Sequence, residues 1–245
     1  MADQDGKIRL FVTADLHEGA SIPLDGDQAH YLFAVMRRSV GALVAVFNGR
    51  DGEWLAGVTE AGKRRGVLVA RAPGQPQRGL PDLWLLFAPL KKSRTDFIVE
   101  KAAELGIARI QPVFTRHTNA ERLRIDRLRA HAIEAAEQCG ETNVAEVSDP
   151  ARLDALLDGW DPARRILFCD ERRDAPPAAA ALEAAPDGPW AILIGPEGGF
   201  APEEFDRLAR HACVLPVSLG PRILRADTAA VAAVTLWQAM RGDWR

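Results

Sequence analysis

Two segments near the C-terminus decide the fold: ILIGPEGGF at residues 192–200 and LGPRILRADTAA at residues 219–230. Each has the pattern of a strand end, a glycine turn and a helix start. In open α/β sheets, ligands bind beyond the carboxyl ends of the strands, where glycine lets the backbone come close. We therefore expect one small ligand to lie across two adjacent turns, at Gly195, Gly198, Gly199 and Gly220. Because turns favour glycine in general, this expectation depends on the pair of motifs.

The chain around these segments alternates strands with helices. Strands are predicted at 83–88, 107–114, 166–170, 191–195 and 214–219, and helices at 93–106, 126–138, 176–185, 202–211 and from 227 or 228 to 240. Ser93 and Asp96 have the spacing of a capping box. Repeated βα units predict an α/β fold with a mostly parallel sheet that is covered by helices on both faces.

The N-terminal part has a different pattern. Short apolar runs at 10–12, 43–47, 54–58 and 67–70 are separated by glycines, which predicts a small β-rich domain or barrel. One helix is expected at 27–37, with Asp27 as its N-cap. Residues 72–81 hold three prolines and two glycines without apolar periodicity, which is typical of a linker. The sequence thus divides into residues 1–72, a linker at 73–81, and residues 82–245.

Composition limits the classes of function. The 245 residues are 47% hydrophobic, enough to fill real cores, and 31 basic residues nearly balance 34 acidic ones. A nucleic-acid site must therefore be a local patch. Cys139, Cys169 and Cys213 have neither disulfide nor zinc spacing, so we expect no metal and a reducing cytoplasmic location. The polar, acidic N-terminus does not look like a signal peptide, and no apolar run is long enough to cross a bilayer, so no membrane partner is expected.

The two glycine motifs resemble those of the RsmE family, the bacterial 16S ribosomal RNA (uracil-N3)-methyltransferases of the SPOUT class. The resemblance spans nearly the whole chain. Matching segments occur in the family's order at 9–12, 30–32 with 35–37, 47–49 with 51–52, Lys91, 101–106 and 137–140. It implies a PUA-like RNA-binding domain at 1–72 and a SPOUT methyltransferase domain at 82–245 with a C-terminal trefoil knot. Periodicity by itself does not indicate such a knot.

The resemblance also implies that the ligand is S-adenosyl-L-methionine, bent between the two turns. Aliphatic side chains beside the turns suit the flat face of adenine, and the exposed backbone suits its polar edge. The expected cofactor-binding residues are Leu193, Ile194, Gly195, Glu197, Gly198, Gly199, Leu219, Gly220, Ile223, Leu224 and Arg225.

Transfer to uracil N3 requires loss of the imide proton and stabilisation of the charge that spreads onto the flanking carbonyl oxygens. Arg225 and Arg222 are the candidate cations for this role, although solvated or phosphate-facing arginines have the same appearance in a sequence. Glu197 is a candidate base or a partner of the cofactor's amino group. It could also stabilise a nearby helix N-terminus.

For RNA binding, the candidate residues are Arg9, His30, Arg37, Arg38, Lys91, Lys92 and Arg94. Cations of this kind position phosphates without reading sequence. The resemblance implies a homodimer that acts on one uridine of 16S ribosomal RNA or of the small ribosomal subunit.

One position departs from the family pattern. Many members have arginine after the EQxG run, where this chain has Glu141. Asn143, Arg116 or Arg122 could take over that role, or the role is not needed. Two alternatives remain open: transfer to a ribose 2′-hydroxyl, and a non-catalytic RNA-binding protein of ribosome assembly. Nucleotide hydrolysis ranks lower, because neither turn ends in the Gly-Lys-Ser/Thr of a phosphate loop.

Overall fold

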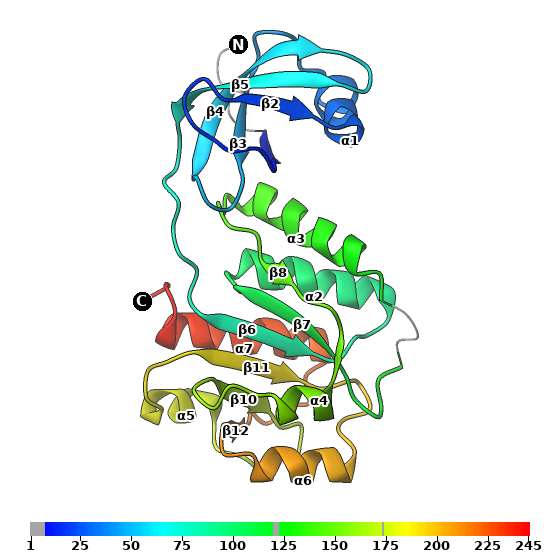
Figure 1. Ribbon diagram of the computed structural model, residues 1–245. Coiled ribbons are helices and arrows are strands. Elements are labelled where there is room, and N and C mark those ends of the chain that lie inside the picture. The colour runs from blue at the N-terminus through cyan, green and yellow to red at the C-terminus, as the bar shows by residue number, and fades with distance from the viewer. Residues whose placement is uncertain (1–7, 120–122, 173) are drawn as a thin grey trace. The chain divides into compact units, whose positions relative to one another are not determined.

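The computed structural model describes residues 8–119, 123–172 and 174–245, apart from the side chain of Lys92 (Figure 1). The described chain forms two compact units. The first comprises the residues up to Gly79 together with Ala136–Val144, and the second comprises Leu80–Ala135 and Ala145–Arg245. The sequence-based division assigns residues 136–144 to the C-terminal domain, and its linker at 73–81 is divided between the two units.

The first unit contains one five-stranded sheet. Its strands are β1 (Arg9–Phe11), β2 (Ser21–Leu24), β3 (Leu43–Phe47), β4 (Glu53–Ala61) and β5 (Gly66–Pro73), in the order β1-β3-β4-β5-β2. Only the β1–β3 pair is parallel. Alternate residues such as Ile22, Val44 and Leu68 point into one buried apolar cluster. The predicted β-rich N-terminal domain is confirmed, although β2 was not predicted.

The helix of the first unit begins earlier than the sequence indicates. It consists of α1 (Gly26–Ala29) and a π-helical continuation, η1 (His30–Val35). The N-cap is Asp25, whose Oδ1 accepts hydrogen bonds from the backbone N–H groups of Asp27 (3.0 Å) and Gln28 (2.8 Å). Asp27, the predicted cap, instead lies in the first turn, where its negative charge suits the helix dipole.

The second unit is built on a parallel sheet. Its strands are β6 (Leu83–Phe87), β7 (Arg109–Phe114), β8 (Glu146–Val147), β9 (Ala151–Arg152), β10 (Arg165–Cys169), β11 (Trp190–Ile194) and β12 (Val214–Val217). The strand order is β12-β10-β11-β6-β7-β8, with β9 also paired to β7, and every pair is parallel. The α/β prediction is confirmed, while the two-residue strands β8 and β9 were not predicted.

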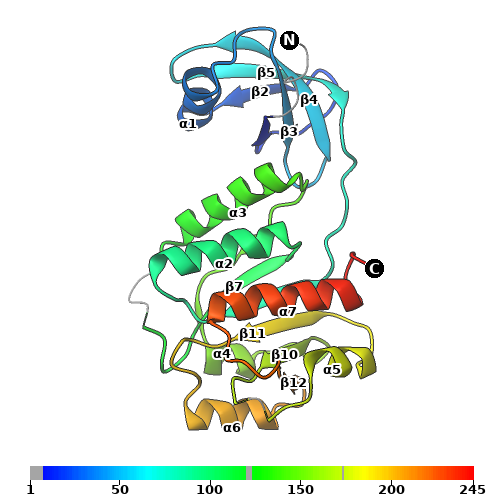
Figure 2. The same ribbon diagram turned by 180° about the vertical axis from the view of Figure 1, so that it is seen from behind.

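Helices cover both faces of this sheet (Figure 1, Figure 2). They are α2 (Lys92–Glu104), α3 (Ile125–Cys139), α4 (Leu153–Asp158), α5 (Ala178–Ala184), α6 (Pro202–Arg210) and α7 (Ala226–Arg241). On one face, α4 and α6 pack with Leu86, Phe168 and Leu193 in a single core cluster. On the other face, α2 and α7 pack against each other and over Leu85. Leu85 and Leu86, which are consecutive on β6, therefore point into the apolar cores on opposite faces of the sheet.

Two helix starts involve residues to which the sequence analysis gave a role. The expected capping box of Ser93 and Asp96 does not form, because the N-cap of α2 is Lys91 and makes no side-chain cap bond. Asp96 instead accepts a hydrogen bond of 2.6 Å from Arg127 on α3. The last helix begins at Ala226, with Arg225 as its N-cap.

The order of the strands corrects one further expectation. The strands that precede the two glycine turns, β11 and β12, are not hydrogen-bonded neighbours, because β10 lies between them and pairs with both. A third strand therefore ends beside the two turns. The trefoil knot stays a prediction of the family resemblance.

None of the helices within the described residues is long and apolar enough to cross a membrane.

Arg9 occupies a buried polar position in the first unit. Its Nε donates to Glu53 (2.7 Å), and its Nη atoms donate to the backbone carbonyls of Ala136 (2.6 Å) and Glu141 (2.8 Å). The guanidinium also lies over the ring of Phe47. With its side chain only 10% exposed, Arg9 holds the sheet to residues 136–141, whereas the sequence predicts an exposed cation for phosphate.

We predict that Arg9→Ala lowers the free energy of unfolding by about 3 kcal/mol, because it leaves the Glu53 carboxylate, 13% exposed, without its cation. Urea denaturation followed by circular dichroism measures this. Arg50→Ala is the matched control, since Arg50 and its partner Asp15 are 52% and 84% exposed and such pairs contribute at most about 1 kcal/mol. Equal losses in the two variants would contradict the assignment.

Candidate functional site

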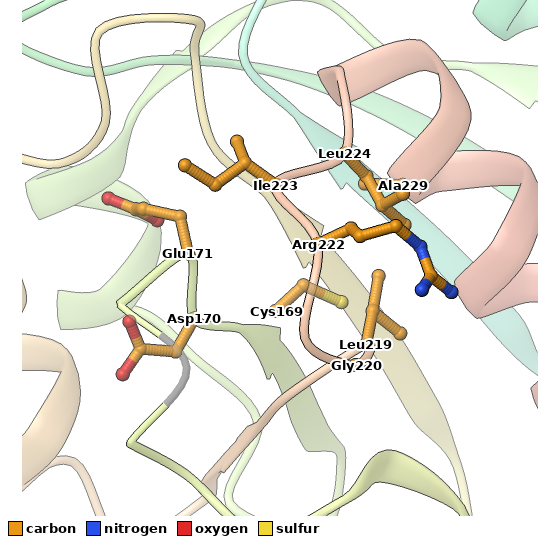
Figure 3. A pocket seen from close by; sticks show the side chains of 9 residues that line it. All are labelled: Cys169, Asp170, Glu171, Leu219, Gly220, Arg222, Ile223, Leu224 and Ala229. Carbon is orange, nitrogen blue, oxygen red and sulfur yellow. The ribbon is translucent and has the colours of Figure 1, made fainter.

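The site lies at the carboxyl edge of the parallel sheet, where β10, β11 and β12 end. An open cavity of about 510 Å³ is lined there by the turn after β11, the end of β10 and the start of α7. A smaller cavity of about 60 Å³ adjoins it between the end of β10 and the segment 219–224 (Figure 3). Five residues line both: Cys169, Glu171, Ile223, Leu224 and Ala229.

The turn after β11 requires glycine at two places. Gly199 has a φ of 68°, which side-chain-bearing residues rarely adopt. Gly195 packs against Phe200, so that a Cβ at Gly195 would lie 2.5 Å from the ring. Phe200 itself packs edge-on against Phe168 of β10, with ring centroids 5.1 Å apart. The turn is thereby tied to the sheet core.

Two side chains from other segments hold this turn in place. His117, which follows β7, directs Nδ1 at the carbonyl oxygens of Gly198 (3.2 Å) and Gly199 (3.1 Å), so Nδ1 is the donor. Glu204 of α6 accepts from the backbone N–H groups of Arg116 (2.8 Å) and Ala201 (3.0 Å). Sequence reasoning assigned no role to His117, because its partners are backbone atoms about 80 residues away and no side-chain spacing marks it.

The end of β10 supplies the wall that the sequence analysis missed. Cys169 and Glu171 line both cavities, and Asp170 lines the smaller one (Figure 3). Glu171 accepts a hydrogen bond from the backbone N–H of Phe200 (3.4 Å), which links it to the turn after β11. The available signal was the polar pair 170–171 directly after a buried strand, at the edge where ligands bind.

The segment between β12 and α7 forms the opposite wall. Gly220 has a φ of 109°, and no atom lies within 4 Å of the position that a Cβ would take. The hydroxyl of Ser218 accepts from the Gly220 N–H (3.2 Å) and fixes the bend. Beyond it, the side chains of Arg222 and Ile223 point in opposite directions (Figure 3). Ile223 lines both cavities and is still 77% exposed, which is unusual for a large apolar residue.

The predicted cofactor-binding residues converge here with one exception. Leu193 is fully buried in the core beneath α4 and α6 and lines neither cavity. The other ten each line at least one cavity: Ile194, Gly195, Glu197, Gly198, Gly199, Leu219, Gly220, Ile223, Leu224 and Arg225.

The candidate catalytic residues differ in their surroundings. Arg222 and Arg225 are exposed, and Arg225 lines the larger cavity. Glu197 also lines this cavity but forms an ion pair with Arg94 of α2. Because Glu197 is ion-paired, it is less suited to act as a general base than the sequence suggested.

The candidate RNA-binding residues differ in their exposure and in their ion pairs. His30, Arg37 and Lys91 are exposed, Arg38 is half-buried, and Arg94 is engaged in ion pairs. Arg9 belongs to the fold of the first unit, as described above. The side chain of Lys92 lies outside the described residues.

Glu141 has a local structural role. Its Oε1 accepts hydrogen bonds from the backbone N–H groups of Thr142 (2.7 Å) and Asn143 (3.0 Å) and from the Asn143 side chain (2.8 Å). It therefore closes the turn that follows α3. Asn143 and the exposed Arg116 remain candidates for the arginine role at this position, and Arg122 lies outside the described residues.

No three His, Cys, Asp or Glu side chains are grouped so that they could hold a metal ion, as far as the described part of the chain goes.

Comparison with known sequences identifies two domains. Residues 78–238 match the RNA methyltransferase domain family, and residues 24–70 match the RNA methyltransferase PUA domain family. The ribosomal RNA small subunit methyltransferase E of Synechocystis is 30% identical, covering 95% of this chain and 77% of the relative. The protein of the same name from Rickettsia conorii is 29% identical, covering 92% and 93%.

Solved structures agree with this. The ribosomal RNA small subunit methyltransferase E of Neisseria gonorrhoeae, bound to S-adenosyl methionine, superposes with a TM-score of 0.88 at 25% identity and covers 97% of this chain and 99% of its own. A Legionella pneumophila protein in complex with the same cofactor gives 0.84 at 29% identity, covering 96% and 98%. This chain therefore belongs to the RsmE family of RNA methyltransferases, with a PUA domain before the methyltransferase domain.

Proposed function

We propose that this protein is an S-adenosyl-L-methionine-dependent methyltransferase that modifies N3 of one uridine in 16S ribosomal RNA of the small subunit. The observation that carries the proposal is the cavity formed by three strand ends of one sheet, in a chain that matches cofactor-bound relatives over nearly their full length.

The residues around the cavity fit this cofactor. A volume of about 510 Å³ lies within the range of ligand pockets, about 300–1,000 Å³. Ile194, Ile223 and Leu224 offer apolar surface to an adenine ring, and the backbone of residues 195–199 offers polar groups to its edge. The empty space beside Gly220 leaves room for a ligand to approach the backbone. When bound, the cofactor supplies a methyl group that its sulfonium already activates, so the protein must chiefly align the acceptor.

The acceptor requires positive charge nearby. Removing the N3 proton of uracil places negative charge on the two flanking carbonyl oxygens. Arg225 is exposed and lines the larger cavity, where it can stabilise that charge, and Arg222 is the second candidate. Glu197, paired with Arg94, is a partner for the cofactor's amino group more readily than a base.

In this proposal, exposed cations of both units bind the substrate RNA. His30 lies on the helix of the first unit, Arg37 just after its end, and Lys91 at the start of α2, where each can contact phosphate. The proposal includes a cytoplasmic homodimer, as the family resemblance implies; light scattering of the purified protein tests the dimer directly.

We predict that a strain without this gene lacks 3-methyluridine in its 16S ribosomal RNA. Nucleoside mass spectrometry of RNA from the parent and deletion strains measures this, and a plasmid copy of the gene should restore the mark. Loss of a 2′-O-methyl nucleoside instead would support ribose methylation. An unchanged set of modified nucleosides would support a role limited to RNA binding.

We predict that Arg225→Ala lowers kcat about 100-fold, the size of effect found when one donor to a developing oxyanion is removed. Cofactor affinity should change less than about threefold, because the residue acts on the acceptor. Transfer of labelled methyl groups to 16S ribosomal RNA measures kcat, and calorimetry measures affinity. Arg210→Ala on α6 is the control, an exposed arginine that lines neither cavity. Normal turnover in Arg225→Ala would exclude this role.

Cys169 should not act as a covalent nucleophile, although it lines both cavities. Burial raises the pKa of its thiol to about 12, so the reactive thiolate forms only as the pH approaches that value. We predict that iodoacetamide at pH 8 modifies the exposed Cys139 and leaves Cys169 unmodified, as read by peptide mass spectrometry. Cys169→Ser should retain transfer. Rapid labelling of Cys169 together with loss of transfer in Cys169→Ser would contradict direct transfer.

A further inference from the structure

Arg94 joins the two walls of the larger cavity from a third element. It is the third residue of α2, and its Nη1 forms an ion pair with Oε1 of Glu197, after β11. Its Nε lies 3.7 Å from Oδ2 of Asp227, in the first turn of α7. We call these three residues the rim cluster. A single side chain thus spans the two segments that carry the glycine motifs.

The two acidic members of the rim cluster belong to the two segments that line the larger cavity. Glu197 lines the cavity directly, and Asp227 follows Arg225 and Ala226, which also line it. A change in the distance between Glu197 and Asp227 would therefore move these two segments relative to each other.

The start of α2 gives Arg94 a fixed base. The Thr95 hydroxyl, next in sequence, accepts from the buried backbone N–H of Leu90 (2.9 Å) and donates to the Leu90 carbonyl (3.0 Å). The backbone carbonyl of Lys91 accepts from the N–H of Arg94 (2.8 Å). These bonds fix the backbone at the start of α2, from which the Arg94 side chain extends.

The charges of the rim cluster do not cancel. Two carboxylates share one guanidinium, which leaves one net negative charge at neutral pH. Without the guanidinium, the two carboxylates would repel each other. With the Arg94 side chain 31% exposed, its pairs add little to global stability, so the consequence should be local.

We propose that Arg94 is a positioning residue of the cofactor site, which holds Glu197 and Asp227 and thereby sets the spacing of the two glycine turns. This rests on the proposed function, because it assumes that the cavity binds S-adenosyl-L-methionine. It replaces the phosphate-binding role that the sequence predicts for Arg94. The planar guanidinium, with donors on two sides, suits a bridge between two carboxylates better than an ammonium group does.

The test is calorimetric titration of the full-length protein with S-adenosyl-L-methionine and with S-adenosylhomocysteine, which lacks the sulfonium charge. We expect Arg94→Ala to weaken both ligands about tenfold, since a misplaced wall affects them alike. Arg94→Lys should lose part of this affinity. Lys101→Ala is the control, an ion-paired cation of the same helix that lines neither cofactor cavity, and should bind as the wild type does.

The ratio of the two affinities separates positioning from simple charge. If Arg94 acted only through its charge, Arg94→Ala would bind the cationic cofactor more tightly and leave S-adenosylhomocysteine unchanged, which would overturn the proposal. A double-mutant cycle with Glu197→Gln adds a second criterion, because the effect of Arg94→Ala should be smaller when its partner is already neutral.

Two further outcomes are distinguishable. If the wild-type protein binds neither ligand, the proposed function fails. If the wild type binds both and Arg94→Ala binds them equally well, only the positioning role fails. Weaker binding of 16S ribosomal RNA in Arg94→Ala, with unchanged cofactor affinity, would assign Arg94 to phosphate instead. Circular dichroism and urea denaturation confirm that each variant is folded.

Discussion

The pairing of β10 with both β11 and β12 is the constraint on which the site depends. In the parallel register, Ile166 lies opposite Ala191 on one side and Val214 on the other. All three strands therefore run in the same direction and end at the same edge, so that their following loops meet around one space. Apolar packing beneath α4 and α6 stabilises this pairing, and Phe168 and Leu193 contribute to that packing. A ligand site arises here because the core beneath it fixes the positions at which the strands end and the loops begin.

Glycine then decides how closely the loops can approach that space, and it does so for different reasons at different positions. At Gly199 and Gly220 the backbone itself has a positive φ, so that any side chain would be strained. At Gly195 the backbone is ordinary, and the constraint is the Phe200 ring packed against it. These glycines cannot be told apart in the sequence. Only the structure separates conformational glycines from packing glycines, and the distinction identifies Phe200 as part of the site's support.

The sequence was sufficient for features that depend on local order. The βα alternation and the two glycine turns follow from periodicity and motif, because each depends on residues close together in the chain. Of the eleven residues that the family resemblance predicts to bind cofactor, ten line the two cavities. Contacts between distant segments were not predictable. His117 meets residues 198 and 199 through backbone carbonyls, Glu171 enters through a strand whose place in the sheet no motif specifies, and Arg9 is buried by partners near residue 140. Leu193 was predicted to contact the cofactor but does not line the cavity. Side chains alternate along β11, so Leu193 points into the core while its neighbour Ile194 lines the cavity.

The arginines show how surroundings, and not residue type, assign a role. Arg9, 10% exposed, is held by Glu53 and by backbone carbonyls, and its charge serves the fold. Arg94, 31% exposed, is shared by two carboxylates, Glu197 of the cavity wall and Asp227 at the start of α7. Arg225 is exposed at the same cavity. A reaction that creates negative charge on an incoming base needs a cation that substrate can still reach. Because basic and acidic residues are nearly equal in number, only locally placed cations, and not the overall charge of the chain, could meet this requirement.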